Sequence, residues 1–324
     1  MREKPVSKSA TLQDALLGAT RALCATTRGA YHCDASSRGA LEGDSNHASP
    51  HDDASARLQA ELLLAHALDT TRARLLARLN EPLVPEVAAR YAANVARRVQ
   101  HEPLAYILGH QEFYELDFLV DHRVLIPRHE TETLVQIALE RAKHKSPPVI
   151  VDIGTGSGAL ALVLVQHLPH ARVIATDISR DALDVARSNA HRLSLEARTE
   201  FVESDLLECV DASFDLLVAN LPYIPRARFD QLPREIRAFE PRGALDGGED
   251  GLDLFRRLLA QLQPHAARGA IALLEISEEQ GDAAIEGVRR ALPRTIATLH
   301  QDLEGLDRVV EIKWDADERG NHEP

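Results

Sequence analysis

The feature that most constrains the fold is a short apolar run that leads into a glycine-rich loop and then into a longer apolar segment. The run covers residues 149–153 and the segment covers residues 159–168. The loop between them reads Gly154, Thr155, Gly156, Ser157 and Gly158. A short β-branched run predicts a buried strand, and the longer segment predicts a helix. Because glycines let a ligand approach the backbone and a helix N-terminus favours negative groups, the loop predicts a binding site.

Three further strands are predicted at residues 171–176, 199–203 and 214–219, and polar residues follow each of them. They are followed by Asp177, by Asp205 with Leu206, and by Asn220. An acid about 20 residues past such a glycine loop is the usual partner of ribose hydroxyls. Because ligands of an open parallel sheet bind beyond the carboxyl ends of its strands, these residues predict one shared site.

The last of these strand ends, Asn220-Leu221-Pro222-Tyr223, combines a carboxamide, a backbone carbonyl of fixed direction and an aromatic ring. The carboxamide of Asn220 both accepts and donates hydrogen bonds. Pro222 holds Leu221 in an extended conformation, so the Leu221 carbonyl points in a fixed direction. Tyr223 offers a flat face for stacking. The combination predicts a site for a planar amide or an exocyclic amine.

Two classes of enzyme fit the glycine loop. The spacing Gly154-x-Gly156-x-x-Ala159 matches the relaxed nicotinamide fingerprint, so a nicotinamide-dependent oxidoreductase is the alternative. A hydride-transfer enzyme has no evident use for the segment from Asn220 to Tyr223. That segment resembles the Asn-Pro-Pro-Tyr signature of methyltransferases that act on adenine or cytosine amines or on glutamine amides. The first proline of the signature is Leu here, which still supplies a carbonyl.

Taken together, the four strand ends resemble a class I methyltransferase that uses S-adenosylmethionine. The resemblance implies a Rossmann-like α/β sheet with helices on both faces. It also implies that residues 154–158 hold the methionine part of S-adenosylmethionine, Asp177 the ribose, and Asp205 with Leu206 the adenine edge. The acceptor would be held by Asn220, Leu221, Pro222 and Tyr223, with Asn220 also bordering the cofactor.

Further sequence blocks narrow the resemblance to one family. They comprise Arg97-Arg98, Glu102–Gly109, Val124–Glu132, Glu240–Leu252 and Leu274-Glu275-Ile276. In this order they resemble the peptide chain release factor N5-glutamine methyltransferases. The resemblance implies methyl transfer to the side-chain amide nitrogen of the glutamine in the Gly-Gly-Gln loop of class I release factors, in support of translation termination. A glutamine methyltransferase of ribosomal protein uL3 and a DNA adenine or cytosine amino-methyltransferase are the alternatives.

Composition bears on these alternatives and on location. The net charge of -13 disfavours the broad phosphate-binding surface that a DNA enzyme needs. Cys24, Cys33 and Cys209 have no C-x-x-C spacing, which favours free thiols in a reducing cytosol. No apolar stretch reaches about 18 residues, and the N-terminus lacks a signal-peptide core. We expect a soluble cytoplasmic protein whose partners are class I release factors, with no membrane contact and no direct nucleic-acid substrate.

The chain is expected to have three parts. Residues 1–108 form an N-terminal helical substrate-recognition domain, residues 109–127 a β-hairpin linker and residues 128–324 the methyltransferase domain. Helical periodicity covers residues 11–25, 54–68, 71–79, 85–99 and 131–143, and β-rich character covers residues 113–126. Residues 26–53 are rich in Gly, Ser, His and Asp and predict a flexible insertion. Their irregularly spaced His32, Cys33, His47 and His51 do not predict a metal site.

Two residues outside the main motifs have two interpretations each. Thr131 has the acidic neighbours Glu130 and Glu132, and we interpret this stretch as a helix cap, with a place in the site as the alternative. Glu275 follows a later strand, where direct contact with a ligand and a supporting role are equally open. The helical domain is expected to grip the release factor, the alternative being that it only packs against the catalytic domain.

Overall fold

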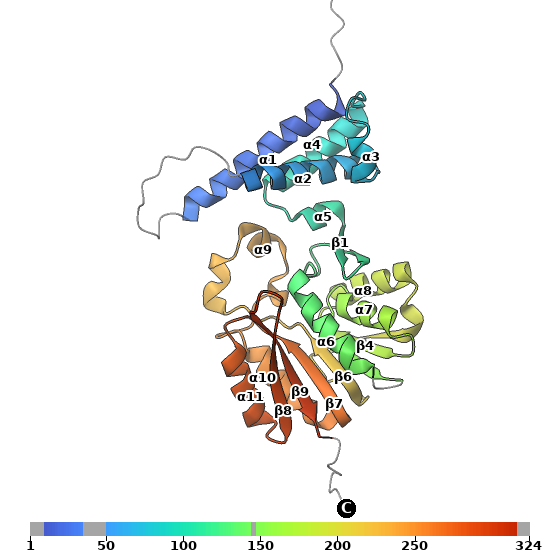
Figure 1. The fold of residues 1–324 in the computed structure, drawn as a ribbon, viewed down its shortest axis with the longest axis vertical. Helices are drawn as coiled ribbons and strands as arrows, with labels where there is room; N and C mark the ends of the chain where they lie inside the picture. Colours follow the sequence, from blue (N-terminus) through green and yellow to red (C-terminus); the bar gives the residue numbers. More distant parts are fainter. Residues whose placement is uncertain (1–9, 35–49, 144–146, 316–324) are drawn as a thin grey trace, which may run out of the picture. The chain divides into compact units, whose positions relative to one another are not determined.

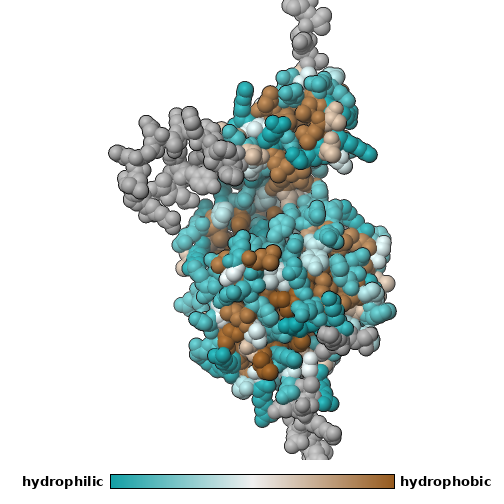
Figure 2. Space-filling view, in the orientation of Figure 1, coloured by the Kyte–Doolittle hydropathy of each residue, from teal (hydrophilic) through white to brown (hydrophobic). Residues whose placement is uncertain are grey.

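A computed structural model describes the backbone of residues 10–34, 50–143 and 147–315, and their side chains except those of residues 27–34 and 50–52. The chain divides into two compact units, Met1–Leu108 and Gly109–Pro324. In the view of Figure 2, hydrophilic residues cover most of the visible face and hydrophobic ones lie between them in patches. Within the described ranges, the chain has no helix with the length and apolar character needed to cross a membrane.

The first unit is helical (Figure 1). Its helices are α1 (Leu12–Asp34), α2 (Pro50–Ala67), α3 (Arg72–Leu76), α4 (Pro85–Val99) and α5 (Leu104–Leu108). Leu16, Leu63, Leu64 and Leu75 form the centre of its core. The buried Tyr91 on α4 donates a hydrogen bond of 3.2 Å from its hydroxyl to the Ala60 carbonyl of α2. Burial of apolar side chains between helices therefore gives this unit a core of its own.

The helical elements differ from the sequence prediction around the expected insertion. Helix α1 continues to Asp34 and α2 begins at Pro50, so both ends of the segment 26–53 are helical. The expectation of a flexible insertion is therefore corrected at residues 26–34 and 50–53, where the two helices continue. Residues 35–49 lie outside the described part. The side chains of His32, Cys33, His47 and His51 lie outside it as well.

The second unit contains two sheets. Their strands are β1 (His110–Phe113), β2 (Leu116–Leu119), β3 (Val149–Ile153), β4 (Arg172–Asp177), β5 (Thr199–Glu203), β6 (Phe214–Ala219), β7 (Ala266–Glu275), β8 (Thr295–Gln301) and β9 (Asp307–Trp314). The α-helices are α6 (Glu132–Ala142), α7 (Ala159–His167), α8 (Arg180–Leu193), α9 (Arg234–Phe239), α10 (Asp253–His265) and α11 (Gly281–Ala291). Short 3-10 turns are η2 (His129–Thr131), η3 (Glu196–Arg198), η4 (Arg226–Gln231) and η5 (Arg242–Ala244).

The main sheet has seven strands in the order β5-β4-β3-β6-β7-β9-β8. The pairs from β5 to β7 are parallel, whereas β9 runs antiparallel to both β7 and β8. Helices α6 and α7 pack together against the sheet, and α10 and α11 pack together against its strands β7 to β9 (Figure 1). The expected Rossmann-like α/β sheet flanked by helices is confirmed.

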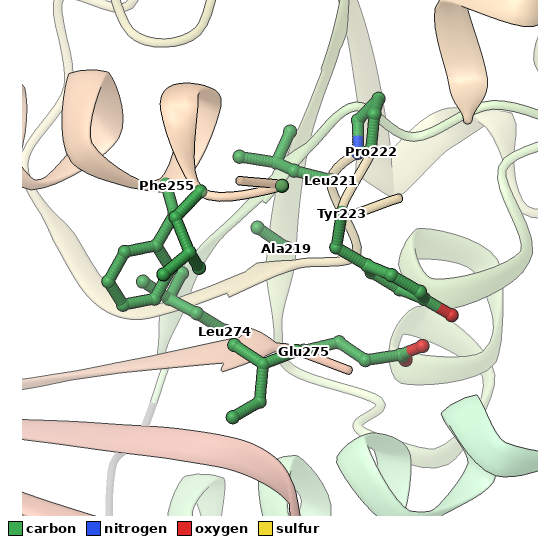
Figure 3. A pocket seen from close by; sticks show the side chains of 10 residues that line it. Ala219, Leu221, Pro222, Tyr223, Phe255, Leu274 and Glu275 are labelled. Carbon is green, nitrogen blue, oxygen red and sulfur yellow. The ribbon is translucent and has the colours of Figure 1, made fainter. Parts of the chain in front are cut away.

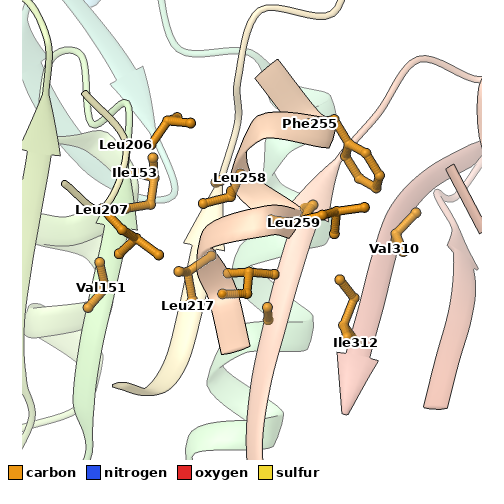
Figure 4. Packing of buried hydrophobic residues seen from close by; sticks show 14 of the residues in the cluster. Val151, Ile153, Leu206, Leu207, Leu217, Phe255, Leu258, Leu259, Val310 and Ile312 are labelled. Atoms are coloured by element: carbon orange, nitrogen blue, oxygen red, sulfur yellow. The ribbon is translucent and has the colours of Figure 1, made fainter. Parts of the chain in front are cut away.

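Alternation along the strands separates the two faces of this sheet. Val151 and Ile153 of β3 point into one hydrophobic cluster, which they share with Leu258 and Leu259 of α10 (Figure 4). Asp152 lies between them in the strand and instead accepts a hydrogen bond from the Ala161 backbone of α7. Successive side chains of a strand point to opposite faces, so β3 serves both layers of helices.

The small hairpin lies within the expected linker of residues 109–127. Strands β1 and β2 pair antiparallel, with His110 opposite Leu119 and Phe113 opposite Leu116. The two turn residues, Tyr114 and Glu115, have φ values of +46° and +65°. A two-residue turn with positive φ at both positions matches the twist of a hairpin. The hairpin thus covers residues 110–119 of the expected 109–127 linker, whereas the apolar residues of the β-rich stretch 113–126 that come after 119 are buried without pairing as a strand.

Candidate active site

The glycine loop after β3 is held by backbone hydrogen bonds to the end of β4. The Thr155 amide donates to the Thr176 carbonyl at 2.8 Å, and the Gly156 amide donates to Asp177 Oδ2 at 2.9 Å. Gly156 has a φ of +58°, and nothing lies within 4 Å of the place where its Cβ would be. The loop therefore presents open backbone next to a carboxylate, which is the form that a close-fitting ligand requires.

Asp177 stands at the end of β4, where the sequence places it. Its Oδ1 accepts a hydrogen bond of 2.9 Å from the Ser179 amide, in addition to the bond from Gly156. Burial raises the pKa of this carboxyl group, and the backbone hydrogen bonds oppose that rise. The next residue, Ile178, leaves 70% of its surface exposed. A carboxylate beside an exposed apolar side chain can bind a sugar hydroxyl and a flat apolar ring together.

Asp152 lies beneath the glycine loop and was not singled out from the sequence. Its Oδ2 accepts hydrogen bonds from the Thr155 hydroxyl at 2.6 Å and from the Ala161 amide at 3.1 Å. Its Oδ1 is buried and has no hydrogen-bond partner among the described residues. Complete burial raises the pKa of Asp152 to about 7. The signal in the sequence was an acid inside an otherwise apolar strand, directly before the glycines.

Asp205 and Leu206 follow β5, and the structure separates their environments. Asp205 Oδ2 accepts a hydrogen bond of 2.7 Å from Arg257 Nη2 on α10. The Leu206 side chain is buried in the hydrophobic cluster of the sheet, and its backbone has a φ of +56°. The Leu206 carbonyl accepts a bond of 3.4 Å from the Thr176 hydroxyl. One of the two residues thus offers a partly paired carboxylate and the other offers backbone.

The Asn220 side chain is oriented by Thr131. Its Nδ2 donates a hydrogen bond of 2.9 Å to the Thr131 hydroxyl oxygen. The structure gives Asn220 Oδ1 no donor from the described side chains and backbone. Thr131 itself is buried and makes no side-chain hydrogen bond to the first turn of α6. The interpretation of Thr131 as a helix cap is therefore wrong, because its hydroxyl accepts from Asn220 and makes no hydrogen bond to the helix.

The backbone of the segment after Asn220 is held by a glycine-containing loop. Gln280 Nε2 donates to the Tyr223 carbonyl at 3.0 Å, and the Gly247 amide donates to the Ile224 carbonyl at 2.9 Å. A Cβ on Gly251 would lie 2.2 Å from the Tyr223 carbonyl oxygen, so only glycine fits there. The block that contains Gly247 and Gly251 was recognised in the sequence, and the structure shows that it supports Tyr223.

A buried ion pair ties the segment before α6 to the segment after α9. Arg128 Nη2 lies 2.5 Å from Glu240 Oε1, and the Ile126 amide donates to Glu240 Oε2 at 3.3 Å. Burial raises the pKa of the Glu240 carboxyl group, while Arg128 opposes the rise. Glu240 belongs to a sequence block whose role was open. The structure shows that it holds the segment that leads to η2 through Ile126 and Arg128.

A small pocket opens beside this segment (Figure 3). Its lining includes Leu221, Pro222, Tyr223, Phe255, Leu274 and Glu275. Figure 3 shows the polar ends of Tyr223 and Glu275 pointing to the same side. Both oxygens of Glu275 are buried, and no described residue makes a hydrogen bond of ordinary geometry to them. Burial raises the pKa of Glu275 to about 7, while the nearby Thr131 hydroxyl and Tyr223 phenol oppose the rise. The pocket thus joins apolar walls to a carboxylate that has no partner of good geometry.

The fold and the strand-end site define a methyltransferase. Residues 150–243 match the family described as "Methyltransferase domain", and residues 49–109 match the family described as "PrmC N-terminal domain". Among solved structures, the chain is similar to the hMettl16 catalytic domain in complex with MAT2A 3'UTR hairpin 6, with a TM-score of 0.51 and 16% identity over 69% of this chain and 82% of that one. This likeness concerns the fold alone.

Curated relatives identify the family. The chain is 47% identical to a release factor glutamine methyltransferase of Moorella thermoacetica, over 78% of this chain and 89% of the relative. It is 43% identical to a release factor glutamine methyltransferase of Geobacter sulfurreducens, over 79% of this chain and 88% of the relative. The chain belongs to the release factor glutamine methyltransferases. This membership does not favour the nicotinamide, uL3 or DNA alternatives.

The buried Asp152 gives a prediction about stability and pH. The unfolded chain loses this proton near its ordinary pKa of 3.8, whereas the folded chain keeps it until about pH 7. Raising the pH through this window therefore favours unfolding of the wild type, and Asp152→Asn lacks this loss. We expect the free energy of unfolding of Asp152→Asn minus that of wild type to rise by roughly 2–4 kcal/mol between pH 4 and pH 7.

Urea unfolding at a series of pH values measures this difference. Asp184→Asn is the control, since Asp184 lies on the surface of α8 and has a side chain that is 53% exposed. A difference between Asp152→Asn and wild type that stays constant with pH would show that Asp152 is not a buried acid with a raised pKa.

Proposed function

We propose that this chain transfers a methyl group from S-adenosylmethionine to the side-chain amide nitrogen of the glutamine in the Gly-Gly-Gln loop of class I release factors. The observation that carries the proposal is the orientation of Asn220. Its Nδ2 donates to the Thr131 hydroxyl, so its Oδ1 can accept a hydrogen bond from a bound substrate. An amide N–H is a donor of the right kind. The family membership of the chain supports the same acceptor.

The strand ends fit S-adenosylmethionine. Open space beside Gly156 suits the close approach of a ligand to the loop, and Asp177 adds a carboxylate beside the exposed Ile178. We assign the methionine part to residues 154–158, the ribose to Asp177 and the adenine edge to Asp205 and the Leu206 backbone. Ile178 is added to this set as an apolar surface for adenine. Asn220 borders the same space because it follows the strand next to β3.

The bound cofactor supplies a methyl group activated by a positively charged sulfur. Amide nitrogen is a weak nucleophile, since its lone pair is delocalised, so the main task of the protein is alignment. Positioning alone can supply up to about 7–11 kcal/mol of the barrier in favourable cases. Asn220 Oδ1 and the Leu221 carbonyl are fixed acceptors for the two N–H groups of the glutamine amide. They stabilise the positive charge that develops on these groups.

Tyr223 and Leu221 complete the acceptor site. The Tyr223 ring forms a wall of the pocket, against which the planar amide can stack. Leu221 Cδ2 lies 3.2 Å from the place where a Cβ would stand on Gly154. The Leu221 side chain therefore packs beside the cofactor loop while its carbonyl serves the acceptor. The methylated amide loses its extra proton readily, so no strong base is required.

We assign recognition of the release factor to the N-terminal helical unit. Transfer to a loop of a folded protein needs more contact area than four residues at a strand end provide. The unit has its own core. Residues 49–109 match the family of the N-terminal domain, and this match does not overlap the methyltransferase match over residues 150–243. The acceptor is a protein loop in this proposal, so neither a nucleic acid nor a membrane takes part in the reaction.

A labelling experiment tests the acceptor. Incubation with labelled S-adenosylmethionine and a class I release factor should label the glutamine of the Gly-Gly-Gln loop. Replacement of that glutamine by alanine should abolish the label, because no amide nitrogen remains. Peptide mapping locates the label. Label that persists on the alanine variant, or that appears only on uL3 or DNA offered in parallel, would contradict the proposed acceptor.

Asp177→Ala tests the cofactor site. We expect S-adenosylmethionine to bind roughly 10- to 100-fold more weakly, because a charged acceptor worth about 1.5–3 kcal/mol is lost. Titration calorimetry measures the affinity. Asp184→Ala removes an acid from the neighbouring helix α8 and should change little. The assignment fails when Asp177→Ala binds as tightly as wild type, or when wild type binds NAD in place of S-adenosylmethionine.

Asn220→Ala and Leu221→Pro separate the two acceptor groups. Asn220→Ala should lower turnover by about 10²–10³, the effect of losing one fixed group that stabilises developing charge. Leu221→Pro keeps the backbone carbonyl and should stay within about tenfold of wild type, or ~1.4 kcal/mol of barrier. Single-turnover rates, melting curves and cofactor affinity are measured on both. A folded Asn220→Ala enzyme with nearly full activity would remove Asn220 from the mechanism.

A further inference from the structure

Three polar side chains from separate segments meet behind the acceptor site. Thr131 precedes α6, Asn220 follows β6 and Glu275 ends β7. Asn220 and Glu275 follow neighbouring strands at the same end of the sheet, because Ala219 of β6 pairs with Leu274 of β7, and Thr131 contacts Asn220 there. Thr131 is 5% exposed and Glu275 is 3% exposed. In the proposed function Asn220 accepts a hydrogen bond from the substrate amide, whereas the buried carboxylate of Glu275 has no assigned role.

The direction of the hydrogen bond between Asn220 and Thr131 requires an explanation. The amide group of Asn220 could point either its oxygen or its nitrogen at a hydroxyl, since a hydroxyl both accepts and donates. The structure has the nitrogen donating to Thr131 Oγ1. The single proton of the Thr131 hydroxyl must then point elsewhere. The described hydrogen bonds include none in which this hydroxyl is the donor.

Glu275 is the acceptor placed to receive that proton. The Thr131 hydroxyl and the Tyr223 phenol are the neighbouring side-chain donors that stabilise its charged form. Neither oxygen of the Glu275 carboxylate accepts a hydrogen bond of ordinary geometry from the described residues. An ionised carboxylate only accepts hydrogen bonds, so it can take the hydroxyl proton of Thr131 but offers none in return.

We propose that ionised Glu275 is a positioning residue that sets the orientation of the Asn220 amide through the Thr131 hydroxyl. The Thr131 hydroxyl donates a hydrogen bond to the Glu275 carboxylate, so its oxygen accepts from Asn220 Nδ2. This arrangement turns Asn220 Oδ1 toward the methyl acceptor. This inference rests on the proposed function of Asn220 as an acceptor of the glutamine N–H. When Glu275 takes up a proton, it donates to Thr131 instead, and Asn220 loses its fixed orientation.

The charges around Glu275 make this relay sensitive to pH. Burial raises the pKa of Glu275 to about 7, and the nearby negative charge of Glu130 adds to the rise. Thr131, the Arg308 guanidinium on β9 and the Tyr223 phenol act in the opposite direction. Arg308 is held at 3.0 Å from Asp302, so its charge is shared. The carboxylate form, and with it the productive Asn220 orientation, is gained as the pH rises through about 7.

Glu275→Gln is the central variant, because Gln has the same shape and no charge. We expect wild-type kcat/KM for the release factor to rise with pH around 7. The variant should lose this rise and turn over about tenfold more slowly at high pH, since one hydrogen bond no longer fixes the orientation. The affinity for S-adenosylmethionine should be unchanged. Glu278→Gln is the control, an acid 4.0 Å from Arg308 with a side chain that is 49% exposed, and it should keep the wild-type profile.

Thr131 supplies the second pair of variants. Thr131→Ser keeps the hydroxyl and should retain the wild-type pH profile, whereas Thr131→Val keeps the shape and should lose both the profile and about tenfold in turnover. A merely structural role of Thr131 would make both variants alike in pH dependence. Melting curves and cofactor binding report whether each variant is folded. The relay is wrong when Thr131→Val keeps the wild-type rate and profile.

A measurement without turnover tests the relay separately from the proposed function. The side-chain amide signals of Asn220 in a proton–nitrogen NMR spectrum are assigned by their absence in Asn220→Ala. They should shift with a midpoint near pH 7 in wild type and stay constant in Glu275→Gln. Signals that shift in both proteins, or in neither, overturn the relay. Failure of wild type to methylate the release factor would instead overturn the proposed function alone, because the amide signals report the relay without it.

Discussion

The site depends on the register of three neighbouring parallel strands, β3, β6 and β7, whose carboxyl ends lie side by side. Ile153 pairs with Ala219, and Ala219 pairs with Leu274. The residues that come next in the three strands are the first glycine of the loop, Asn220 and Glu275, so they emerge side by side. A shift of one residue in any pair would turn that strand's side chains to the opposite face. Backbone hydrogen bonding therefore places the cofactor loop, the acceptor group and the buried acid together.

This arrangement costs stability at two points. Asp152 and Glu275 are fully buried acids, and each has at least one oxygen without a hydrogen-bond partner in the described part of the chain. Leaving a buried polar atom unpaired costs about 1–3 kcal/mol, more when the group is charged. An apolar residue at either position would avoid that cost. Such local conflicts are expected where a site needs particular atoms, and both acids lie directly behind groups that face the ligand space.

The parts that could be predicted from the sequence are those fixed by local patterns. The strand expected at residues 214–219 occurs there as β6, because a short apolar run between polar residues specifies a buried strand. Thr131 was misread as a cap, since its partner Asn220 is 89 residues away and no local pattern shows that contact. The β-rich stretch 113–126 is only partly strand, because Val124 and Ile126 are buried as a strand's residues would be, yet neither pairs. Periodicity predicts burial but does not name the partner.

Leu221 shows how the rigidity of a motif can come from its surroundings. A proline at this position would fix its own φ angle, which Leu does not. Pro222 still holds Leu221 extended, and Gln280 fixes the carbonyl of Tyr223 from the other side. The Leu side chain also packs on the sheet's hydrophobic cluster and beside Gly154. Tertiary contacts thus replace the stiffness of the ring, and the Leu221 carbonyl keeps its direction because Pro222 restricts Leu221 while hydrogen bonds hold Asn220 before it and Tyr223 two residues after it.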